Sequence, residues 1–443
     1  MSSAVQDAVG QQNTEGQQDT VGQQDIAAAV ASLREEAVAM LADLVRHPSL
    51  LGDEKSAQDY MRGVFEDLGL TVDEFAIDEA KLKTHPGYSP SIISYEGRHN
   101  IVGIHEPRHG ARGRSLIFNG HIDVVPIGAE KLWTHPPFEP VIKDGRLYGR
   151  GAGDMKAGIV AYTMAFKALQ KLGFEPAARV MLQSVVEEEC TGNGALACLL
   201  QGYTADAAII TEPTPGIMLA QMGVMWLTLE VSGKPVHASV AHTGAGATDF
   251  AMYMFGELKK LEHRWNAPEG RHEQYRHHEH PVNFNLGKIQ GGEWASSVPT
   301  ECRADIRIGF YPGISPAQVR ETVEKLLAEA YRAHPQNNSL DYRIVYEGFQ
   351  AEGFVLDMNE PVLAALADCH RAVLGSDAQF TAFTGTTDAR FFNLYGNTPA
   401  TCYGPQAGNY HGIDEWVSLD SMMDVTIVLA LFMARWCGLN RLA

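Results

Sequence analysis

The side chains best suited to chemistry in this 443-residue chain are acids and histidines that follow short apolar runs. There are four such places: His121 and Asp123 after 115–119, Glu188 and Glu189 after 180–186, Glu212 after 207–211, and His411 beyond 400–403. Apolar runs of this length read as strands, and open α/β sheets bind ligands at the carboxyl ends of their strands. Several carboxylates gathered at one such edge need a compensating cation, so we expect a metal site there.

The segment 120–126 supplies the first candidate ligand, His121. A neutral imidazole nitrogen suits zinc. Asp123, two residues later, projects to the same side of an extended segment and could accept the other ring N–H, which would fix the histidine tautomer. On this segment alone, a histidine that is merely packed in the core is the more common arrangement.

Asp154 directly follows a glycine-rich segment, 149–153, in which three of five residues are glycine. Such a run allows a tight and unusual backbone. Two interpretations stay open at this point. Aspartate is a preferred N-cap of helices, and the apolar stretch 157–172 that follows reads as a helix. A carboxylate also has two oxygens and could bridge two metal ions.

The three consecutive glutamates 187–189 would repel one another if packed together. A solvated turn is one interpretation. In the other, one carboxylate binds a cation while its neighbour acts as general base on a water molecule. Glu212 and His411 complete a set of two histidines and several carboxylates, which is ligand chemistry for zinc or a similar cation.

The elements that position these residues alternate between strand-like and helical patterns, which predicts an α/β layer architecture over 26–221 and 348–443. The pattern changes over 222–347, where a strand, a long helix, two strands, a helix and a strand follow one another. We predict that this part is an inserted α+β domain. Residues 1–25 repeat Gly-Gln-Gln with few large apolar residues, which predicts a disordered low-complexity tail.

Composition narrows the class of protein. The formal net charge of -19 argues against nucleic acid or an anionic membrane as a partner, while 45% apolar and 20% charged residues are ordinary for a globular protein. The six cysteines form no C-x-x-C pair, so we expect reduced thiols in a cytoplasmic protein. We also expect no signal peptide and no membrane span.

From about residue 30 to the C-terminus, the chain resembles the acetylornithine deacetylase / succinyl-diaminopimelate desuccinylase family, which includes aminoacylases and carboxypeptidases. The motifs occur in family order: those at 120–126, 149–158, 187–189, 211–214, 233–239 and 404–415. The resemblance implies a zinc-peptidase-like catalytic domain with a mixed central sheet flanked by helices, and an inserted lid and dimerisation domain.

The resemblance also implies roles for individual residues. Two Zn²⁺ ions per chain, or Co²⁺ or Mn²⁺ in their place, would be held by His121 and Glu212 on one side, by Glu189 and His411 on the other, and by a bridging Asp154. Asp123 would orient His121, and Glu188 would be the general base. His237 would reach the active site of a partner subunit and stabilise the oxyanion, which implies a homodimer. Substrate contacts would come from Gly385, Thr386, Thr387 and, for a carboxylate, Arg307.

The expected function is therefore hydrolysis of an amide-type C–N bond in a small carboxylate-bearing substrate, as in an N-acyl amino acid deacylase. One alternative is a non-peptide C–N bond, either a formamide of a heterocyclic amine or an aryl amine that is deaminated. Trp294 and the segment 85–90 could line a pocket for such a ring. A di-metal phosphatase and an inactive binding or scaffold protein are more distant alternatives.

Overall fold

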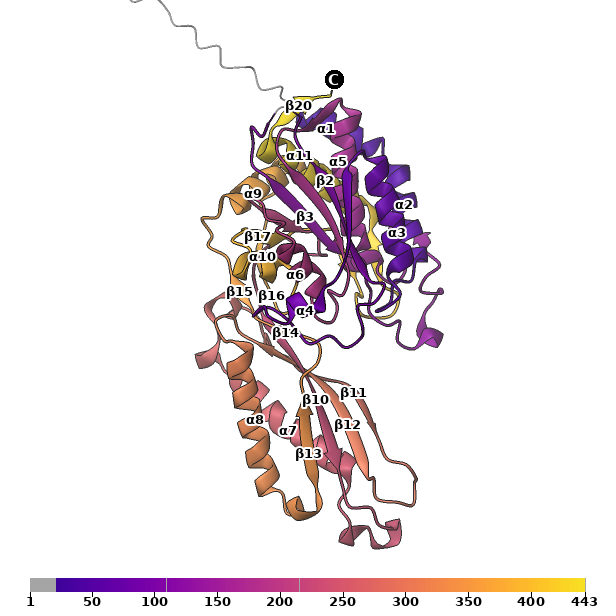
Figure 1. Ribbon diagram of the computed structural model, residues 1–443, viewed down its shortest axis with the longest axis vertical. Helices are drawn as coiled ribbons and strands as arrows, with labels where there is room; N and C mark the ends of the chain where they lie inside the picture. Colours follow the sequence, from indigo (N-terminus) through magenta and orange to yellow (C-terminus); the bar gives the residue numbers. More distant parts are fainter. Residues whose placement is uncertain (1–20, 109, 215, 443) are drawn as a thin grey trace, which may run out of the picture.

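The computed structural model describes residues 21–108, 110–214 and 216–442, which form an upper and a lower unit in Figure 1. The upper unit contains a mixed sheet with strands in the order β1 (Thr71–Ala76), β2 (His99–His105), β7 (Val180–Val185), β3 (Leu116–His121), β8 (Ala208–Ile210) and β17 (Ala400–Cys402). The last four strands are parallel to one another. Their carboxyl ends therefore meet at one edge, next to the residues that we singled out for chemistry.

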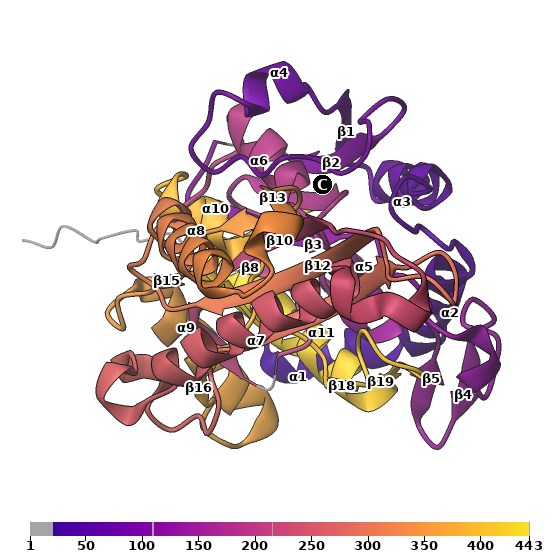
Figure 2. The ribbon, with the colours of Figure 1, turned by 90° about the horizontal axis from the view of Figure 1, so that it is seen from below.

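Helices cover both faces of this sheet, so β3 and β7 are buried along their whole length, as continuous apolar strands of this kind require. On one face, α5 (Ala157–Lys171) and α11 (Leu419–Cys437) pack together with α1 (Gln23–Ala31) and α2 (Arg34–Arg46). On the other face lie α6 (Asn193–Leu200) and α10 (Ala389–Leu394), as the view from below shows (Figure 2). The predicted α/β architecture with a mixed central sheet is confirmed.

The N-terminal boundary differs from the prediction. The tail was expected to extend to residue 25, but α1 already begins at Gln23, whose side-chain amide donates to the Ala372 carbonyl oxygen at 2.6 Å. This contact anchors a segment whose composition alone suggests disorder. Residues 1–20 of the expected tail lie outside the described residues. The chain turns after α1, so residues 23–46 form two separate helices, α1 and α2.

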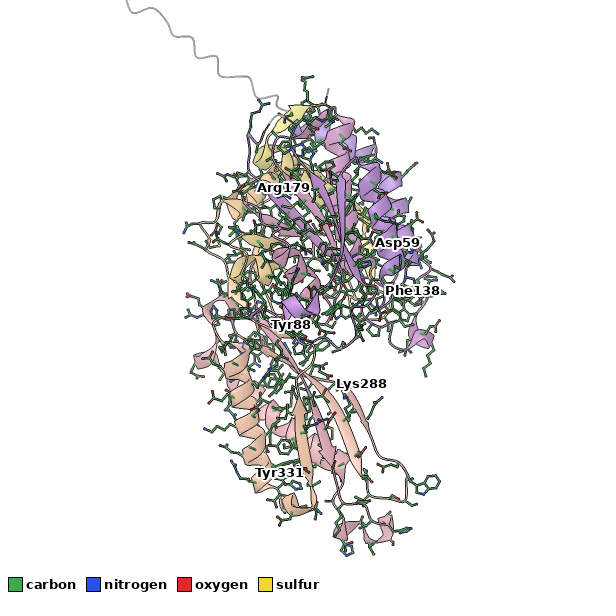
Figure 3. The ribbon with its side chains drawn as sticks, viewed as in Figure 1. Asp59, Tyr88, Phe138, Arg179, Lys288 and Tyr331 are labelled. Atoms are coloured by element: carbon green, nitrogen blue, oxygen red, sulfur yellow. The ribbon has the colours of Figure 1, made fainter. Side chains whose placement is uncertain are left out.

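The lower unit is an antiparallel sheet with strands in the order β11 (Phe284–Gly291), β12 (Glu301–Phe310), β10 (Gly223–Ser232) and β13 (Asp341–Val345), with α7 (Ala247–Trp265) and α8 (Pro316–Ala333) packed together beside it. It has a hydrophobic core of its own, which includes Met225, Leu227, Phe250 and Val323. All the elements expected over 222–347 are present. Near the lower end of α8, Tyr331 donates its hydroxyl to the carbonyl oxygens of Asn337 and Leu340 (Figure 3).

The chain crosses between the units twice. The first crossing runs from β9 (Ile217–Gln221), through the single residue Met222, directly into β10. The second returns through residues 346–353, where Gly348 N–H donates to Pro90 O at 2.8 Å and Gln350 N–H donates to Ser89 Oγ at 3.0 Å. Tyr88, labelled in Figure 3, marks this place at the lower edge of the upper unit. The segment 88–90 therefore fastens the returning chain.

Other short elements complete the described chain. They are α3 (Lys55–Asp67), α4 (Glu79–Leu82), α9 (Pro361–Leu374), β6 (Phe174–Pro176) with β20 (Leu439–Arg441), β14 (Gln350–Ala351) beside β10, and β15 (Phe354–Val355) and β16 (Phe380–Phe383) on either side of β9. A further sheet has the order β18 (Ala407–Gly408), β19 (Trp416–Ser418), β5 (Arg146–Tyr148), β4 (Val141–Lys143). This sheet brings the loop with His411 beside the glycine-rich loop. In the part of the chain described here, no helix is both long and apolar enough to cross a membrane.

The contact between α5 and β8 gives a test of this packing. A Cβ atom at Gly158 would lie 2.0 Å from the carbonyl oxygen of Thr211, the residue that precedes Glu212. We expect Gly158→Ala to lower the free energy of unfolding by about 1–3 kcal/mol, because helix and strand must separate. Gly63→Ala in α3 is the control, since no atom lies within 4 Å of its added Cβ, and it should stabilise by up to about 1 kcal/mol. Equal Tm values for the two variants would contradict this packing.

Candidate active site

The five side chains predicted to bind metal come together at the carboxyl edge of the sheet. His121, the last residue of β3, places Nε2 3.2 Å from Asp154 Oδ1, and His411 Nε2 lies 3.4 Å from Asp154 Oδ2. Asp154 therefore lies between two imidazoles, one beside each of its oxygens. Glu189 Oε2 is 3.0 Å from His411 Nε2, and Glu212 Oε1 is 3.6 Å from His121 Nε2.

The donor atoms form two overlapping groups. One contains His121, Asp154 and Glu189, the other His121, Glu188 and Glu212, and within each group the donor atoms lie within 4.8 Å of one another. Imidazole nitrogens and carboxylate oxygens together are the ligands that zinc and related divalent ions prefer. The residues present therefore fit a site for divalent metal ions.

Electrostatics supports the same conclusion. Burial raises the pKa of Glu188 and of Glu212 well above the usual glutamate value. The charge of Glu189 raises the pKa of His411 to about 12, although burial opposes it, and Asp154 adds to the effect. Burial alone would lower the pKa of His121, but its hydrogen bond to Asp154 and the charge of Glu212 raise it well above its usual value. The cluster attracts positive charge strongly, and bound cations would satisfy it.

The glutamate triplet divides into one structural residue and two that face the site. Glu187 has a positive φ of 70°, and its side chain turns away from the cavity. Its Oε2 accepts a hydrogen bond from Arg98 Nη1 at 2.9 Å. Arg98 also pairs with Glu54, and all three side chains are buried. Glu188 and Glu189 line the cavity. Glu188 and Glu189 are therefore the two members of the triplet that are available to the site.

The role expected for the Asp123 side chain needs a correction. The ring nitrogen Nδ1 of His121 lies 2.9 Å from the backbone carbonyl oxygen of Asp123 but 3.8 Å from its carboxylate. The carboxylate instead accepts hydrogen bonds from the backbone N–H groups of Glu188 and Glu189, at 3.2 and 3.1 Å. The reason is that β3 ends at His121, so the alternation of an extended strand no longer applies two residues later. The backbone carbonyl group of Asp123 thus orients the imidazole of His121. The carboxylate of Asp123 holds the loop that carries Glu188 and Glu189.

A cavity of about 420 Å³ opens above these residues. The predicted substrate residues Arg307, Gly385, Thr386 and Thr387 line it. Arg307, on β12, donates to Thr384 O and Asn283 O, both at 3.4 Å, and burial lowers the pKa of its guanidinium. The cavity therefore has its floor on the upper unit and one wall on the lower unit.

Sequence reasoning missed the aromatic part of this wall. Trp226, Phe349 and Phe383 line the cavity, and the rings of Trp226 and Phe349 meet edge to face with centroids 5.3 Å apart. Trp294, which was expected to line it, is 73% exposed and does not line the cavity of its own chain. The segment 85–90 does not line it either, since part of that segment binds the returning chain. The available signal was the position of Trp226 on the same face of its strand as Thr228 and Glu230, opposite the core residues Met225 and Leu227, where a large aromatic side chain is unexpected.

His237 lies apart from this cluster within its own chain. It follows β10 in the lower unit, is exposed, and its Nδ1 lies 2.8 Å from Ser239 Oγ. It does not line the cavity formed by the same chain.

Asp388, at the start of α10, makes stability depend on pH. Within the described residues, neither of its buried carboxylate oxygens has a hydrogen-bond partner, and burial raises its pKa to about 7. An unfolded aspartate titrates near about 3.9. Between these values the folded state holds the extra proton, so stability should fall as pH rises, by up to about 1.4 kcal/mol per unit, and level off above pH ~7. Asp388→Asn should flatten this fall in Tm curves between about pH 5 and 8. Parallel curves for variant and wild type would contradict the shift.

Comparison with known proteins agrees with the site. Residues 117–435 match the model of peptidase family M20/M25/M40. The chain is 27% identical to the N-formyl-4-amino-5-aminomethyl-2-methylpyrimidine deformylase of Halalkalibacterium halodurans, over 94% of this chain and 98% of that protein. It is 26% identical to a probable succinyl-diaminopimelate desuccinylase of Staphylococcus aureus, over 87% and 94%.

Solved structures show the same fold at low sequence identity. The dipeptidase Dug1p of Saccharomyces cerevisiae has a TM-score of 0.78 at 16% identity and covers 94% of this chain and 98% of its own. Human carnosine dipeptidase 1 has a TM-score of 0.74 at 14% identity, with 94% and 100% covered. Together with the cluster of ligand-type side chains at the strand ends, the family match over 117–435 identifies this chain as a metallohydrolase of peptidase family M20/M25/M40 that cleaves amide-type C–N bonds.

Proposed function

We propose that this protein uses two divalent ions, most suitably Zn²⁺, to hydrolyse the amide bond of a small N-acyl amine that carries a carboxylate. The observation that carries the proposal is the position of Asp154 between His121 and His411, one imidazole beside each carboxylate oxygen. In this proposal Asp154 bridges the ions, His121 and Glu212 hold one, and Glu189 and His411 hold the other. Co²⁺ or Mn²⁺ could take the same ligands.

The chain's own residues would carry the proton transfers. When bound, the ions would polarise the acyl carbonyl group and lower the pKa of a water molecule. Glu188 faces the cavity with Oε2 3.8 Å from His121 Nε2. It would take a proton from the attacking water and return one to the leaving nitrogen, so that a carboxylate and an amine are released. The Asp123 carboxylate holds the backbone of Glu188 in place for this step.

The position of Arg307 favours a substrate that carries a carboxylate. Arg307 lines the same cavity as the acidic cluster. Among the residues that the structure describes, its hydrogen bonds go to the backbone carbonyl oxygens of Asn283 and Thr384, and no acidic side chain pairs with it. In a protein with a net charge of -19, such a cation is well placed to select an anionic group.

A second candidate, hydrolysis of a formamide on a heterocyclic amine, is favoured by the aromatic wall. The aromatic side chains of Trp226, Phe349 and Phe383 line the cavity, which suits a planar ring. The deformylase relative, matched over almost its whole length, supports this candidate. Both candidates share the amide chemistry and differ in the amine that is released.

All six cysteines are buried and free, which supports a reducing compartment, and we propose the cytoplasm. The strongly acidic charge supports a small-molecule substrate over nucleic acid or an anionic membrane as partner.

The role of Glu188 can be tested by Glu188→Gln. The amide keeps the shape of the side chain but cannot accept the proton, so we expect kcat to fall by about 10²–10⁴. Because Glu188 is not a ligand in this proposal, the variant should keep the metal content of the wild type, measured by atomic absorption on the purified protein. Near-normal turnover in a metal-loaded variant would show that another group is the base.

A substrate panel separates the two candidates. Purified metal-loaded enzyme is assayed with N-acetyl and N-succinyl amino acids, an N-formyl aminomethylpyrimidine and aminoaryl compounds, with and without a chelator. We expect N-acyl amino acids to be hydrolysed, chelation to abolish turnover, and Arg307→Met to raise KM more than about tenfold, because the carboxylate loses a charged partner. Trp226→Leu should change KM little for these substrates. The opposite ranking of the two variants, with the formamide preferred, would establish the second candidate. Release of ammonia from the aminoaryl compounds without any amide cleavage would refute both.

We also propose a homodimer formed through the lower unit, in which His237 of each chain serves the site of the other. Its exposure, its distance from the lining of its own cavity and its place in the motif at 233–239 support this arrangement. In such a dimer His237 would stabilise the oxyanion that develops on the acyl carbonyl.

Mixing two inactive variants tests this arrangement. His237→Ala and Glu188→Gln should each have little activity alone. After subunit exchange, a mixed dimer contains one site with both residues, so activity should recover to at most about a quarter of the wild-type value. The control is a mixture in which both chains carry Glu188→Gln. Activity that stays at the level of the separate variants, with exchange verified by mass spectrometry, would rule out the shared site.

A further inference from the structure

Arg150 and Glu415 form a buried ion pair beside the proposed metal site. The distance from Arg150 Nη1 to Glu415 Oε2 is 2.6 Å, and each side chain is 1% exposed. Arg150 belongs to the glycine-rich loop that ends at Asp154. Glu415 ends the loop that contains His411. Neither residue faces the cavity, so the proposed chemistry gives them no direct part.

The carboxylate of Glu415 holds the backbone of the glycine-rich loop. Its Oε2 accepts from Arg150 and from Gly151 N–H at 3.1 Å, and its Oε1 accepts from Gly153 N–H at 2.9 Å and Asp154 N–H at 3.0 Å. The loop also packs closely against Ala407, since a Cβ at Gly153 would lie 2.6 Å from the Ala407 Cβ. Glu415 therefore fixes the position of the backbone from which the Asp154 side chain extends.

The guanidinium of Arg150 joins the same loop to two others. Its Nη2 donates to Gly412 O at 3.0 Å, next to His411, and to Pro126 O at 3.2 Å, in the segment that follows His121 and Asp123. One side chain thus connects the three loops that supply His121, Asp154 and His411.

The loop with His411 needs such support. Asn409, His411 and Asp414 have positive φ values of 56°, 60° and 54°, a conformation that side chains disfavour. His121, in contrast, is the last residue of a fully buried strand and pairs there with Val185 of β7. Losing the ion pair should therefore disturb His411 and Asp154 more than His121.

We propose that Arg150 and Glu415 are positioning residues that set the separation of Asp154 and His411, and so determine the affinity of the metal position shared by Asp154, Glu189 and His411. The inference rests on the proposed two-ion site and goes beyond it, because it concerns the unequal dependence of the two positions on one buried pair. It uses no contact between this pair and a substrate.

The test is a metal titration. Full-length protein is freed of metal with a chelator and titrated with CoCl₂, followed by visible absorption and equilibrium dialysis. Wild type should bind two equivalents. In Glu415→Gln and Arg150→Met, one equivalent should bind about 10–100-fold more weakly, while the other, which shares Asp154 but not His411, should weaken by only about threefold. Arg150→Lys keeps the charge but not the forked contacts, so we expect an intermediate loss of affinity at the same position. This variant tests the proposal if the other two variants do not fold.

Glu262→Gln is the matched control. Glu262 is also buried and ion-paired, and it accepts Phe284 N–H at 2.9 Å, but it lies in the lower unit away from the metal site. It should leave both affinities unchanged. Folded Arg150 and Glu415 variants that bind both equivalents like wild type, or that lose both equally, would overturn the positioning role. A wild-type protein that binds only one equivalent would overturn the two-ion proposal instead, and the variants would still report the effect of the pair on that ion.

Discussion

The structure depends on one electrostatic constraint, the crowding of carboxylates at the buried end of a sheet. The side chains of Asp154, Glu188, Glu189 and Glu212 are each at most 14% exposed and lie around the buried ring of His121 and the half-exposed ring of His411. Like charges in such surroundings raise one another's free energy, and burial adds to the cost. A protein keeps this arrangement when bound cations compensate it, so the same crowding that disfavours the metal-free site favours metal binding.

The carboxylates that do not face the cavity are treated differently. Glu187 and Glu54 share Arg98, and Glu415 has Arg150 together with three backbone N–H groups. The buried glutamates near the site are thus of two kinds, those paired with arginine and those directed at the cavity. The first kind fixes the loops, and the second kind supplies ligands and a base. This division explains how three consecutive glutamates can be buried without simply repelling one another.

Much of the site could be predicted because it lies at strand ends. Apolar runs identified β3, β7 and β8, and the residues after them had to meet at one edge of the sheet. Other features depend on tertiary contacts that no local pattern shows. Asp123 orients His121 through its carbonyl oxygen because the strand has already ended. The aromatic wall comes from Trp226 rather than Trp294 because the lower unit is oriented with β10 against the cavity. The start of α1 at Gln23 depends on a contact with residue 372, far away in the sequence.

The single residue between β9 and β10 has a consequence for selectivity. With only Met222 at one crossing and residues 346–353 at the other, the lower unit is joined to the upper unit along a narrow hinge (Figure 1). The metal-binding floor belongs to one side of that hinge, while Trp226 and Arg307 belong to the other. The relative orientation of the two units therefore sets the distance between the ligand cluster and the side chains of Trp226 and Arg307, and with it the length of substrate that the cavity can hold.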